Sequence, residues 1–338
     1  MAGKLWITLS VFTVTFLGIG GCAALKALPL LRETTHATLT TPTTENPVAV
    51  TLLASPTSTL QPPTPTPLPT LSAEEMKTAI LDLVQDNGAC QLPCFWELSP
   101  GNTDVQTLNI FMGRWYNVKT SEYYLKIHDF GDVGGFSLVF KEQKTHVLVD
   151  FSYIKDTSNM ELEMLTMNGY ALGEFGTTPE GALDLRPIYG DTLFAQTFEY
   201  YMLPSILSTY GAPEQVSLAT WQDDPDHPRI KTQPFSLVLF YPDQGFFVEY
   251  VTEREVIGNR YAGCPSKSHI YLGTWDPKKV LSLPYVAQKA GSVINELNTD
   301  YFQSVEDATS LTLDEFYNTF KNPENTTCLE TSRDLWLP

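Results

Sequence analysis

The stretch Phe136-Ser137-Leu138-Val139-Phe140, followed by Lys141-Glu142-Gln143-Lys144 and Val147-Leu148-Val149-Asp150-Phe151, decides the fold class of this chain. Two runs rich in β-branched and aromatic residues lie one polar turn apart, which predicts an antiparallel hairpin. From about Tyr123 apolar and polar residues already alternate, so a strand is expected before the hairpin. A further strand is expected at Leu162–Met167. Consecutive strands joined by short turns favour an antiparallel meander over a parallel sheet.

Two helices are predicted before this meander. Ser72-Ala73-Glu74-Glu75 has the pattern of a capping box, with Ser72 as N-cap and Glu75 at the third helical position. Apolar residues then recur on one helical face, and Asn87-Gly88 is a typical helix end. Thr103 is expected to cap the second helix. The apolar stripe of that helix comprises Val105, Leu108, Phe111, Met112 and Trp115.

The same plan is repeated further along the chain. A short helix with Pro204 in its first turn is predicted over Leu203–Tyr210. The strands expected after it are Val216–Trp221, Phe235–Phe240 and Phe246–Val251. Because the strands beginning at Phe136 and Phe235 share the letters Phe-Ser-Leu-Val, we predict an α+β fold of antiparallel meander sheets with packed helices. Its two tandem pseudo-repeats are placed at 72–170 and 171–338.

The C-terminal part is predicted to be helical again. Val280 to Leu297 has helical spacing, with a break expected at Pro284. Thr312-Leu313-Asp314-Glu315 is a second capping box. The stripe after it comprises Leu313, Phe316, Tyr317 and Phe320, and Asn322-Pro323 is expected to end the helix.

The N-terminus has the three parts of an export signal: a basic start at Lys4, an apolar run over Leu5–Ile19 and small residues before Cys22. The run is shorter than the ~20 apolar residues of a membrane span. Leu17-Gly18-Ile19-Gly20-Gly21-Cys22 resembles a bacterial lipobox. The resemblance implies a signal peptide over 1–21, cleaved before a diacylated Cys22. An ordinary signal peptide with a chance cysteine and a simple N-terminal span are the alternatives.

Residues 22–71 are expected to form a tether behind the lipidated cysteine. Arg32 to Leu71 is dominated by Thr, Pro and Ser, as in Gln61-Pro62-Pro63-Thr64-Pro65-Thr66-Pro67. Such a segment lacks the apolar content that would offset the entropy lost on ordering. In polyproline geometry, at ~3.1 Å per residue, it extends up to ~100 Å. We therefore predict a stalk that carries a folded domain on the outer face of the cell membrane.

The charge of the chain excludes some classes of partner. The formal net charge is -18, and the basic and acidic residues before residue 72 nearly cancel. An acidic surface repels nucleic acid and anionic lipid. No nucleic-acid partner is therefore expected.

Four cysteines remain after Cys22: Cys90, Cys94, Cys264 and Cys328. An even number in an oxidising compartment predicts two disulfides, for which three connectivities exist. We favour Cys90–Cys94 as a local staple and Cys264–Cys328 as a long-range bond. A redox pair and a zinc site are the alternatives, although three residues separate the first pair and no further ligands stand at finger-like spacing.

The sequence has no nucleophile elbow, phosphate loop, dinucleotide fingerprint or metalloprotease motif. His128, His146 and the other three histidines are not at metal-ligand spacing. The weak metal candidates are the loop Asp223-Asp224-Pro225-Asp226-His227 and the group His128, Asp129 and Asp132. Glu161 and Glu163 are a weak candidate carboxylate pair. We expect no cofactor, no metal and no assigned catalytic residue, and leave open an enzyme whose site has no local signature.

Several segments resemble known bacterial proteins. They are Cys90-Gln91-Leu92-Pro93-Cys94-Phe95-Trp96, Pro100-Gly101-Asn102-Thr103, Tyr210-Gly211-Ala212-Pro213 and the tail around Phe316 and Cys328. Together they resemble uncharacterised envelope lipoproteins of filamentous Chloroflexota-type bacteria. The Gly-x-Thr and Tyr-Gly-x-Pro segments are also similar to those of the small lipoprotein of the barrel assembly machine and of β-lactamase inhibitor proteins. Both groups pack helices on antiparallel strands. The two motifs are not joined here as they are there, and fold-level likeness transfers no function.

The anchor, the stalk and the absence of catalytic motifs lead to one functional hypothesis. The chain is expected to be a lipid-anchored, extracytoplasmic, non-catalytic binding module. Its partners are expected to be membrane lipid, through acylated Cys22, and an envelope or extracellular protein or glycan. The alternatives are a secreted hydrolase-like enzyme and a solute-binding subunit of a transporter. The latter needs two α/β lobes with parallel strands.

Overall fold

Burial alternates along the predicted meander. In β4 (Thr145–Asp156), Val147, Val149, Phe151 and Tyr153 are buried and the residues between them are half-buried. Because successive side chains of a strand point to opposite faces, one face of the sheet lies in the core and the other is partly open. These features belong to a computed structural model, which describes residues 71–120, 123–156, 158, 161–178, 183–220, 234–290 and 302–336.

The described helices and strands form an α+β fold, as predicted. The helices are α1 (Ala73–Asp86), α2 (Val105–Met112), α3 (Thr192–Thr197), α4 (Leu203–Tyr210), α5 (Leu283–Ala290), α6 (Val305–Ala308) and α7 (Leu313–Phe320). The strands beside β4 are β1 (Val118–Lys119), β2 (Tyr123–Asp129), β3 (Val133–Glu142), β5 (Glu161–Thr177), β6 (Leu183–Pro187), β7 (Gln215–Ala219), β8 (Pro234–Tyr241), β9 (Phe246–Glu253), β10 (Glu255–Ile257), β11 (Arg260–Gly263), β12 (His269–Trp275), β13 (Phe302–Ser304) and β14 (Leu329–Ser332).

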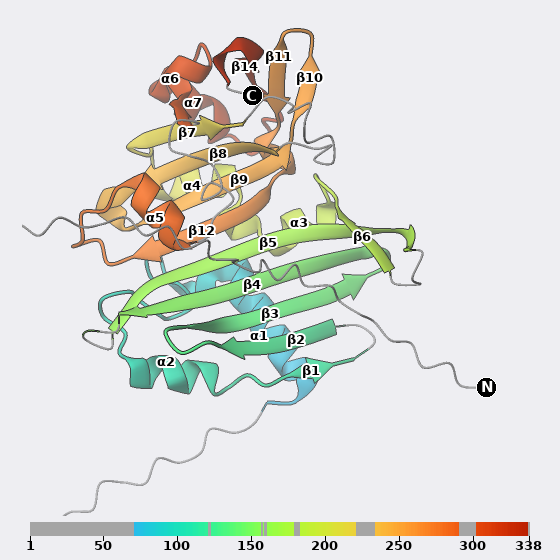
Figure 1. The fold of residues 1–338 in the computed structure, drawn as a ribbon, viewed down its shortest axis with the longest axis vertical. Coiled ribbons are helices and arrows are strands. Elements are labelled where there is room, and N and C mark those ends of the chain that lie inside the picture. Colours follow the sequence, from blue (N-terminus) through green and yellow to red (C-terminus); the bar gives the residue numbers. More distant parts are fainter. Residues whose placement is uncertain are drawn as a thin grey trace, which may run out of the picture. The chain divides into compact units, whose positions relative to one another are not determined.

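One 11-stranded sheet runs through the fold in the order β1-β2-β3-β4-β5-β12-β9-β8-β7-β13, with β6 on β5. Every pair among the described strands is antiparallel. The meander β2-β3-β4-β5 therefore meets the reversed series β12-β9-β8-β7 at the central pair β5 and β12 (Figure 1). A separate small sheet has the order β10-β11-β14.

Local sequence signals place most helix ends correctly. The capping boxes at Ser72 and Thr312 are both present, and α4 begins and ends where predicted. The cap of α2 differs: Asp104 accepts a hydrogen bond from the backbone of Thr107, at 2.7 Å, and is the N-cap. Thr103 does not cap the helix because its hydroxyl oxygen accepts from the backbone N–H of Ser99 in the preceding turn.

The later elements depart from their predicted bounds. Helix α5 begins at Leu283, so Pro284 lies in its first turn, where its missing N–H costs little, and does not break the helix. The rest of the predicted helix up to Leu297, like Trp221 of the predicted strand, lies outside the described residues. Strand β5 continues ten residues past the predicted end at Met167, to Thr177.

The two expected units share one sheet. The boundary at 170/171 falls inside β5, so the chain passes from one half to the other within a strand. The predicted units 72–170 and 171–338 both fall within one compact unit, Leu68–Pro338. The signal peptide and the stalk up to residue 70 lie outside the described residues.

Helices cover the two faces of the sheet unequally. Behind β3 and β4 lies α1 (Figure 1), over a core in which the Trp96 ring stacks 5.0 Å from Phe151 and 5.7 Å from Phe136. On the opposite face α5 covers β12, where Val286 belongs to a cluster with Phe247 and Trp275. Figure 1 shows no helix in front of β2, β3 or β4 in the described part of the chain. The side chains that β4 directs to this half of the face are half-buried, not buried.

Candidate functional site

Polar side chains from six adjacent strands lie in one row across the sheet. Strand pairing aligns them residue by residue, each with the next, in the order Lys126, Ser137, Asp150, Asn168, Tyr271 and Glu249. Directly paired residues in an antiparallel sheet point to the same face. At about 4.8 Å per strand, the row spans about 24 Å. We call these six residues the polar row.

The polar row is symmetric about the centre of the sheet. Asn168 of β5 pairs with Tyr271 of β12 at the junction of the two meanders. Asp150 lies on the strand next to β5, and Glu249 lies on the strand next to β12. The two carboxylates thus occupy equivalent positions in the two halves.

Exposure falls along the polar row from β2 to β9. Lys126 is exposed, and Ser137, Asp150 and Asn168 are half-buried. Tyr271 and Glu249 have 3% and 0% of their surface exposed. The half of the row on β2–β5 is therefore the part that a ligand can reach.

Asp150 is the charged centre of the accessible half. Its carboxylate accepts a hydrogen bond from the Ser137 hydroxyl at 2.5 Å. Partial burial raises the pKa of Asp150, and the Ser137 hydrogen bond and nearby His128 oppose this shift. Burial in turn lowers the pKa of His128, so that this imidazole is neutral at pH 7. Asp150 thus has unused acceptor capacity at the surface of the sheet.

Asn168 adds a second acceptor beside Asp150. Its side-chain oxygen is buried and has no hydrogen-bond partner among the described residues. A buried amide oxygen without a partner is costly, and such atoms commonly mark a place where water or a ligand binds.

A row of different character lies on each side of the polar row. Towards one end of the strands the aligned residues are Tyr124, Val139, Leu148 and Tyr170. Towards the other end they are His128, Gly135, Ser152 and Thr166. Burial raises the pKa of Tyr170 and of the neighbouring Tyr271, and the Glu249 carboxylate adds to both shifts. Both phenols are therefore neutral hydrogen-bonding groups at pH 7.

A cluster of charged side chains from β3, β4 and β5 lies on the same face, beyond the row that contains Tyr170. The Lys141 ammonium and the His146 ring both contact the Glu174 carboxylate, at 2.5 and 2.7 Å. Hydrogen bonds from these two groups lower the pKa of Glu174. Because its charges are matched internally, this cluster adds little net charge to the face.

The spacing of the two carboxylates bears on catalysis. Asp150 and Glu249 are three strands apart, about 14 Å at the backbone. Paired carboxylates that hydrolyse glycosides stand about 5 to 9.5 Å apart. The polar row is thus arranged for hydrogen bonding rather than for two-carboxylate hydrolysis.

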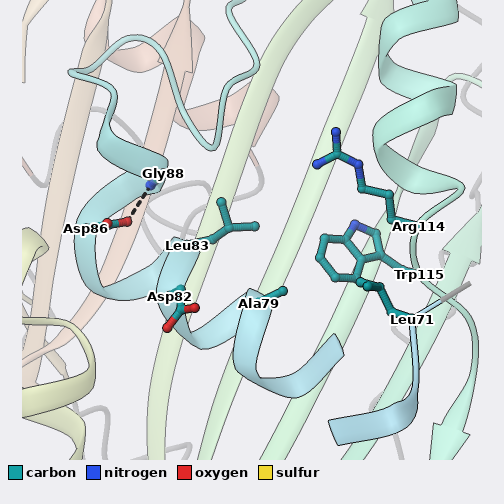
Figure 2. Close-up of a pocket in the computed structure, with 8 residues that line it drawn as sticks. All are labelled: Leu71, Ala79, Asp82, Leu83, Asp86, Gly88, Arg114 and Trp115. Atoms are coloured by element: carbon teal, nitrogen blue, oxygen red, sulfur yellow. Dashed lines mark hydrogen bonds between the residues drawn. The ribbon is translucent and has the colours of Figure 1, made fainter. Parts of the chain in front are cut away.

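A second candidate is a hollow of about 460 Å³ beside α1. Figure 2 shows Ala79 and Leu83 of α1 directed towards Trp115, and Asp82 directed away from it. Asp86 accepts from the backbone N–H of Gly88 at 2.8 Å. Polar groups do not converge inside this hollow, so it has fewer features of a binding site than the polar row.

The predicted cysteine pairs are both present. Cys90 lies at disulfide distance from Cys94, and Cys264 from Cys328, with Cα separations of 5.8 and 4.1 Å. The second pair joins the C-terminal segment to β11, next to the pairing of Gly263 with Leu329. No redox or zinc arrangement is needed to explain these residues. Cys22 lies outside the described residues.

A fully buried amide holds the Cys90–Cys94 loop. The Asn87 side-chain nitrogen donates to the carbonyls of Cys90 and Cys94, at 2.8 and 2.9 Å. Its oxygen accepts from the Trp96 backbone N–H at 3.2 Å and from the Tyr201 hydroxyl at 3.1 Å. Asn87 has a left-handed backbone with φ of 58° and 0% of its surface exposed. We call this group the Asn87 hub.

The structure does not bring the weak metal candidates together. Within the described ranges, no group of three His, Cys, Asp or Glu side chains is arranged to hold a metal ion. The Asp223–His227 loop lies outside those ranges. Glu163, of the weak carboxylate pair with Glu161, forms an ion pair with Lys289 at 3.5 Å. His269 is buried and contacts the Ile188 carbonyl at 3.0 Å, a structural role.

Sequence reasoning missed most of the polar row, although its signal was present. Lys126 stands in the alternating pattern before the first hairpin, and Asp150 and Glu249 each interrupt an apolar strand. A charged residue inside an apolar strand signals a polar position on one face. Strand register, which depends on residues far apart in the sequence, was needed to place these residues in one row.

Comparison of the chain with known protein families, with curated proteins and with solved structures gives no significant match in any of the three. No helix in the described part of the chain has both the length and the apolar character needed to cross a membrane.

Proposed function

We propose that this chain is a lipid-anchored, extracytoplasmic binding module whose ligand lies on the open half of the sheet. The observation that carries the proposal is the polar row, which presents hydrogen-bonding side chains in register on a face that α1 and α2 do not cover. Half-buried polar groups on rigid strands are preorganised for recognition. In this proposal Cys22 carries the lipid and residues 22–71 hold the domain away from the membrane.

Two alternatives have less support. A solute-binding subunit needs parallel strands in two lobes, whereas every pair of described strands is antiparallel. A hydrolase would need convergent acid and base groups, and Asp150 and Glu249 are too far apart for this role. A binding function requires neither feature.

The anchor is tested by replacing Cys22→Ser in the full chain. We expect the parent protein to remain with membranes and to show acyl mass on an N-terminal cysteine. The variant should be released by a wash that leaves the parent bound. Release of the parent by the same wash would contradict the anchor and leave the binding face untouched.

The binding face is tested by photo-crosslinking in the native host. A benzoylphenylalanine placed at Ser152, on the open face, should give adducts of higher mass. The same group at Asp243, exposed in the turn between β8 and β9, is the matched control. Equal adducts from both positions, or none from Ser152, would refute binding at this face.

A further inference from the structure

The outer face of β2–β5 has a defined composition. It comprises the positions of β2–β5 in the polar row and its two flanking rows: Tyr124, Lys126, His128, Gly135, Ser137, Val139, Leu148, Asp150, Ser152, Thr166, Asn168 and Tyr170. Gly135 and Thr166 are buried, and the other ten positions are half-buried or exposed. We call these twelve positions the β2–β5 face. The identity of its ligand rests on the proposed function, because the ligand is assigned to that same face.

The β2–β5 face is electrically balanced within an acidic chain. It contains one lysine and one aspartate, and burial keeps His128 neutral at pH 7, whereas the whole chain has 39 acidic and 21 basic residues. An anionic polymer would be repelled by Asp150 and by the chain as a whole, and the one lysine and one aspartate of the face give it no excess charge that would select a cationic one. An uncharged ligand needs no charge partner on this face.

Donors and acceptors are mixed along the face. Lys126 donates, Asp150 accepts, and Ser137 and Asn168 can do both. The Asn168 oxygen lacks a partner among the described residues, and one hydrogen bond from Ser137 leaves acceptor sites on Asp150. A hydroxyl group, which donates and accepts at once, satisfies such a surface better than a group of a single kind.

An apolar strip runs beside the polar groups. The half-buried side chains of Tyr124, Val139, Leu148 and Tyr170 are aligned across the same four strands. Rings and aliphatic groups of this kind pack against the C–H surface of a flat ring, while polar neighbours bind its edge. Side by side, the two rows match a ligand that has apolar faces and hydroxyl edges.

The shape of the face favours an extended ligand. The face of β2–β4 has no described helix in front of it, and the hollow beside α1 is lined by none of the twelve positions. Four strands at about 4.8 Å give about 14 Å of aligned contacts, so a short polymer across the strands engages all of them.

We propose that the β2–β5 face binds an uncharged glycan, laid across the strands with its hydroxyl groups on Asp150 and Asn168 and its ring faces on Tyr170 and Leu148.

The test uses the full acylated chain in detergent and isothermal titration calorimetry. The neutral probes are cellohexaose, maltohexaose, mannohexaose and xylohexaose, and the charged probes are chitosan hexamer and oligogalacturonate. The site variants are Asp150→Asn, which keeps an acceptor for Ser137, and Asn168→Ala. Asp243→Asn makes the same chemical change in an exposed turn and is the matched control. Thermal unfolding confirms that each variant is folded.

At least one neutral hexasaccharide should bind. Its affinity should fall about 10-fold or more in both site variants, because a hydrogen bond to a charged or buried group is lost. The control should change it by less than about twofold.

Each other outcome overturns a distinct claim. If a neutral hexasaccharide binds with the same affinity to the parent and to both site variants, the β2–β5 face is not the binding site. Binding of only a charged probe, lost in Asp150→Asn, would keep the face and overturn the uncharged ligand. No sugar binding, together with a protein adduct at Ser152, would overturn the glycan and retain the binding module.

Discussion

Replacement of Asn87 should destabilise the fold more than any surface change nearby. All four hydrogen-bonding positions of this side chain are used, at 2.8 to 3.2 Å, and the residue is fully buried. In Asn87→Gly the left-handed backbone stays unstrained, but four hydrogen bonds are lost: two to the part-buried carbonyls of the disulfide loop and two from the buried Trp96 N–H and Tyr201 hydroxyl. At about 1 kcal/mol for each, the free energy of unfolding should fall by about 4 kcal/mol.

Two further substitutions separate the contributions at this position. Asn87→Ala adds the steric cost of a left-handed Ala, about 1 kcal/mol beyond the glycine variant. Asn87→Asp replaces the amide NH₂, which donates to the Cys90 and Cys94 carbonyls, by a carboxylate oxygen that cannot donate. Burial raises the pKa of the new carboxyl group. Its stability deficit should therefore shrink as the pH falls and the carboxyl is protonated.

Equilibrium unfolding in urea, with both disulfides intact, measures these differences through tryptophan fluorescence. The reporter is local, because the buried Trp96 donates its backbone N–H to Asn87. Asp86→Asn is the matched control: it retains an acceptor for Gly88 on an exposed side chain and should change stability by less than about 0.5 kcal/mol. If Asn87→Gly unfolds at the same urea concentration as the parent, the Asn87 hub does not stabilise the fold through these hydrogen bonds.

Two other predictions concern the disulfides and a buried histidine. Replacing Cys264 and Cys328 by Ser should lower the free energy of unfolding by about 4 kcal/mol, because they are 64 positions apart in the sequence. The same change at Cys90 and Cys94, four positions apart, should cost about 2 kcal/mol. Equal costs in urea titrations would contradict the loop-entropy argument. Burial lowers the pKa of His269, so it is neutral in the folded chain. Its contribution to stability is complete above pH ~6.5 and is lost as the pH falls below that value. Melting temperatures measured between pH 7.5 and 5 should fall more in the parent than in His269→Gln; identical slopes would exclude this histidine as their cause.

Local features of the fold could be predicted because they depend on few neighbouring residues. The capping boxes at Ser72 and Thr312 need one side chain and a residue three positions later, and both are confirmed. The predicted N-cap of α2 was wrong by one residue, because Thr103 and Asp104 are both suitable capping residues. The Thr103 hydroxyl instead accepts a hydrogen bond from Ser99 in the turn before the helix. Such competition depends on three-dimensional context that spacing alone does not contain.

The candidate site could not be predicted, because it is a property of register. Lys126 and Asp150 share a face only when β3 is aligned between them, and a shift of one residue would move either to the other face. The cysteine pairs were easier to predict, because four residues allow few combinations. A row built from six strands has far more alignments, of which folding selects one.

The symmetry of the sheet is consistent with placing the proposed ligand face in the first half. Asp150 and Glu249 hold equivalent positions, so the strands alone would offer two similar faces. Helix α5, which follows the last strand of the second meander, packs over that half and accompanies the burial of Tyr271. No described helix covers the face of β2–β4 that carries Asp150, and this residue is half-buried rather than buried. Because a helix covers only one of the two equivalent halves, the same strand pattern gives a buried cluster in the second half and, in the first half, the exposed polar groups on which the proposed binding rests.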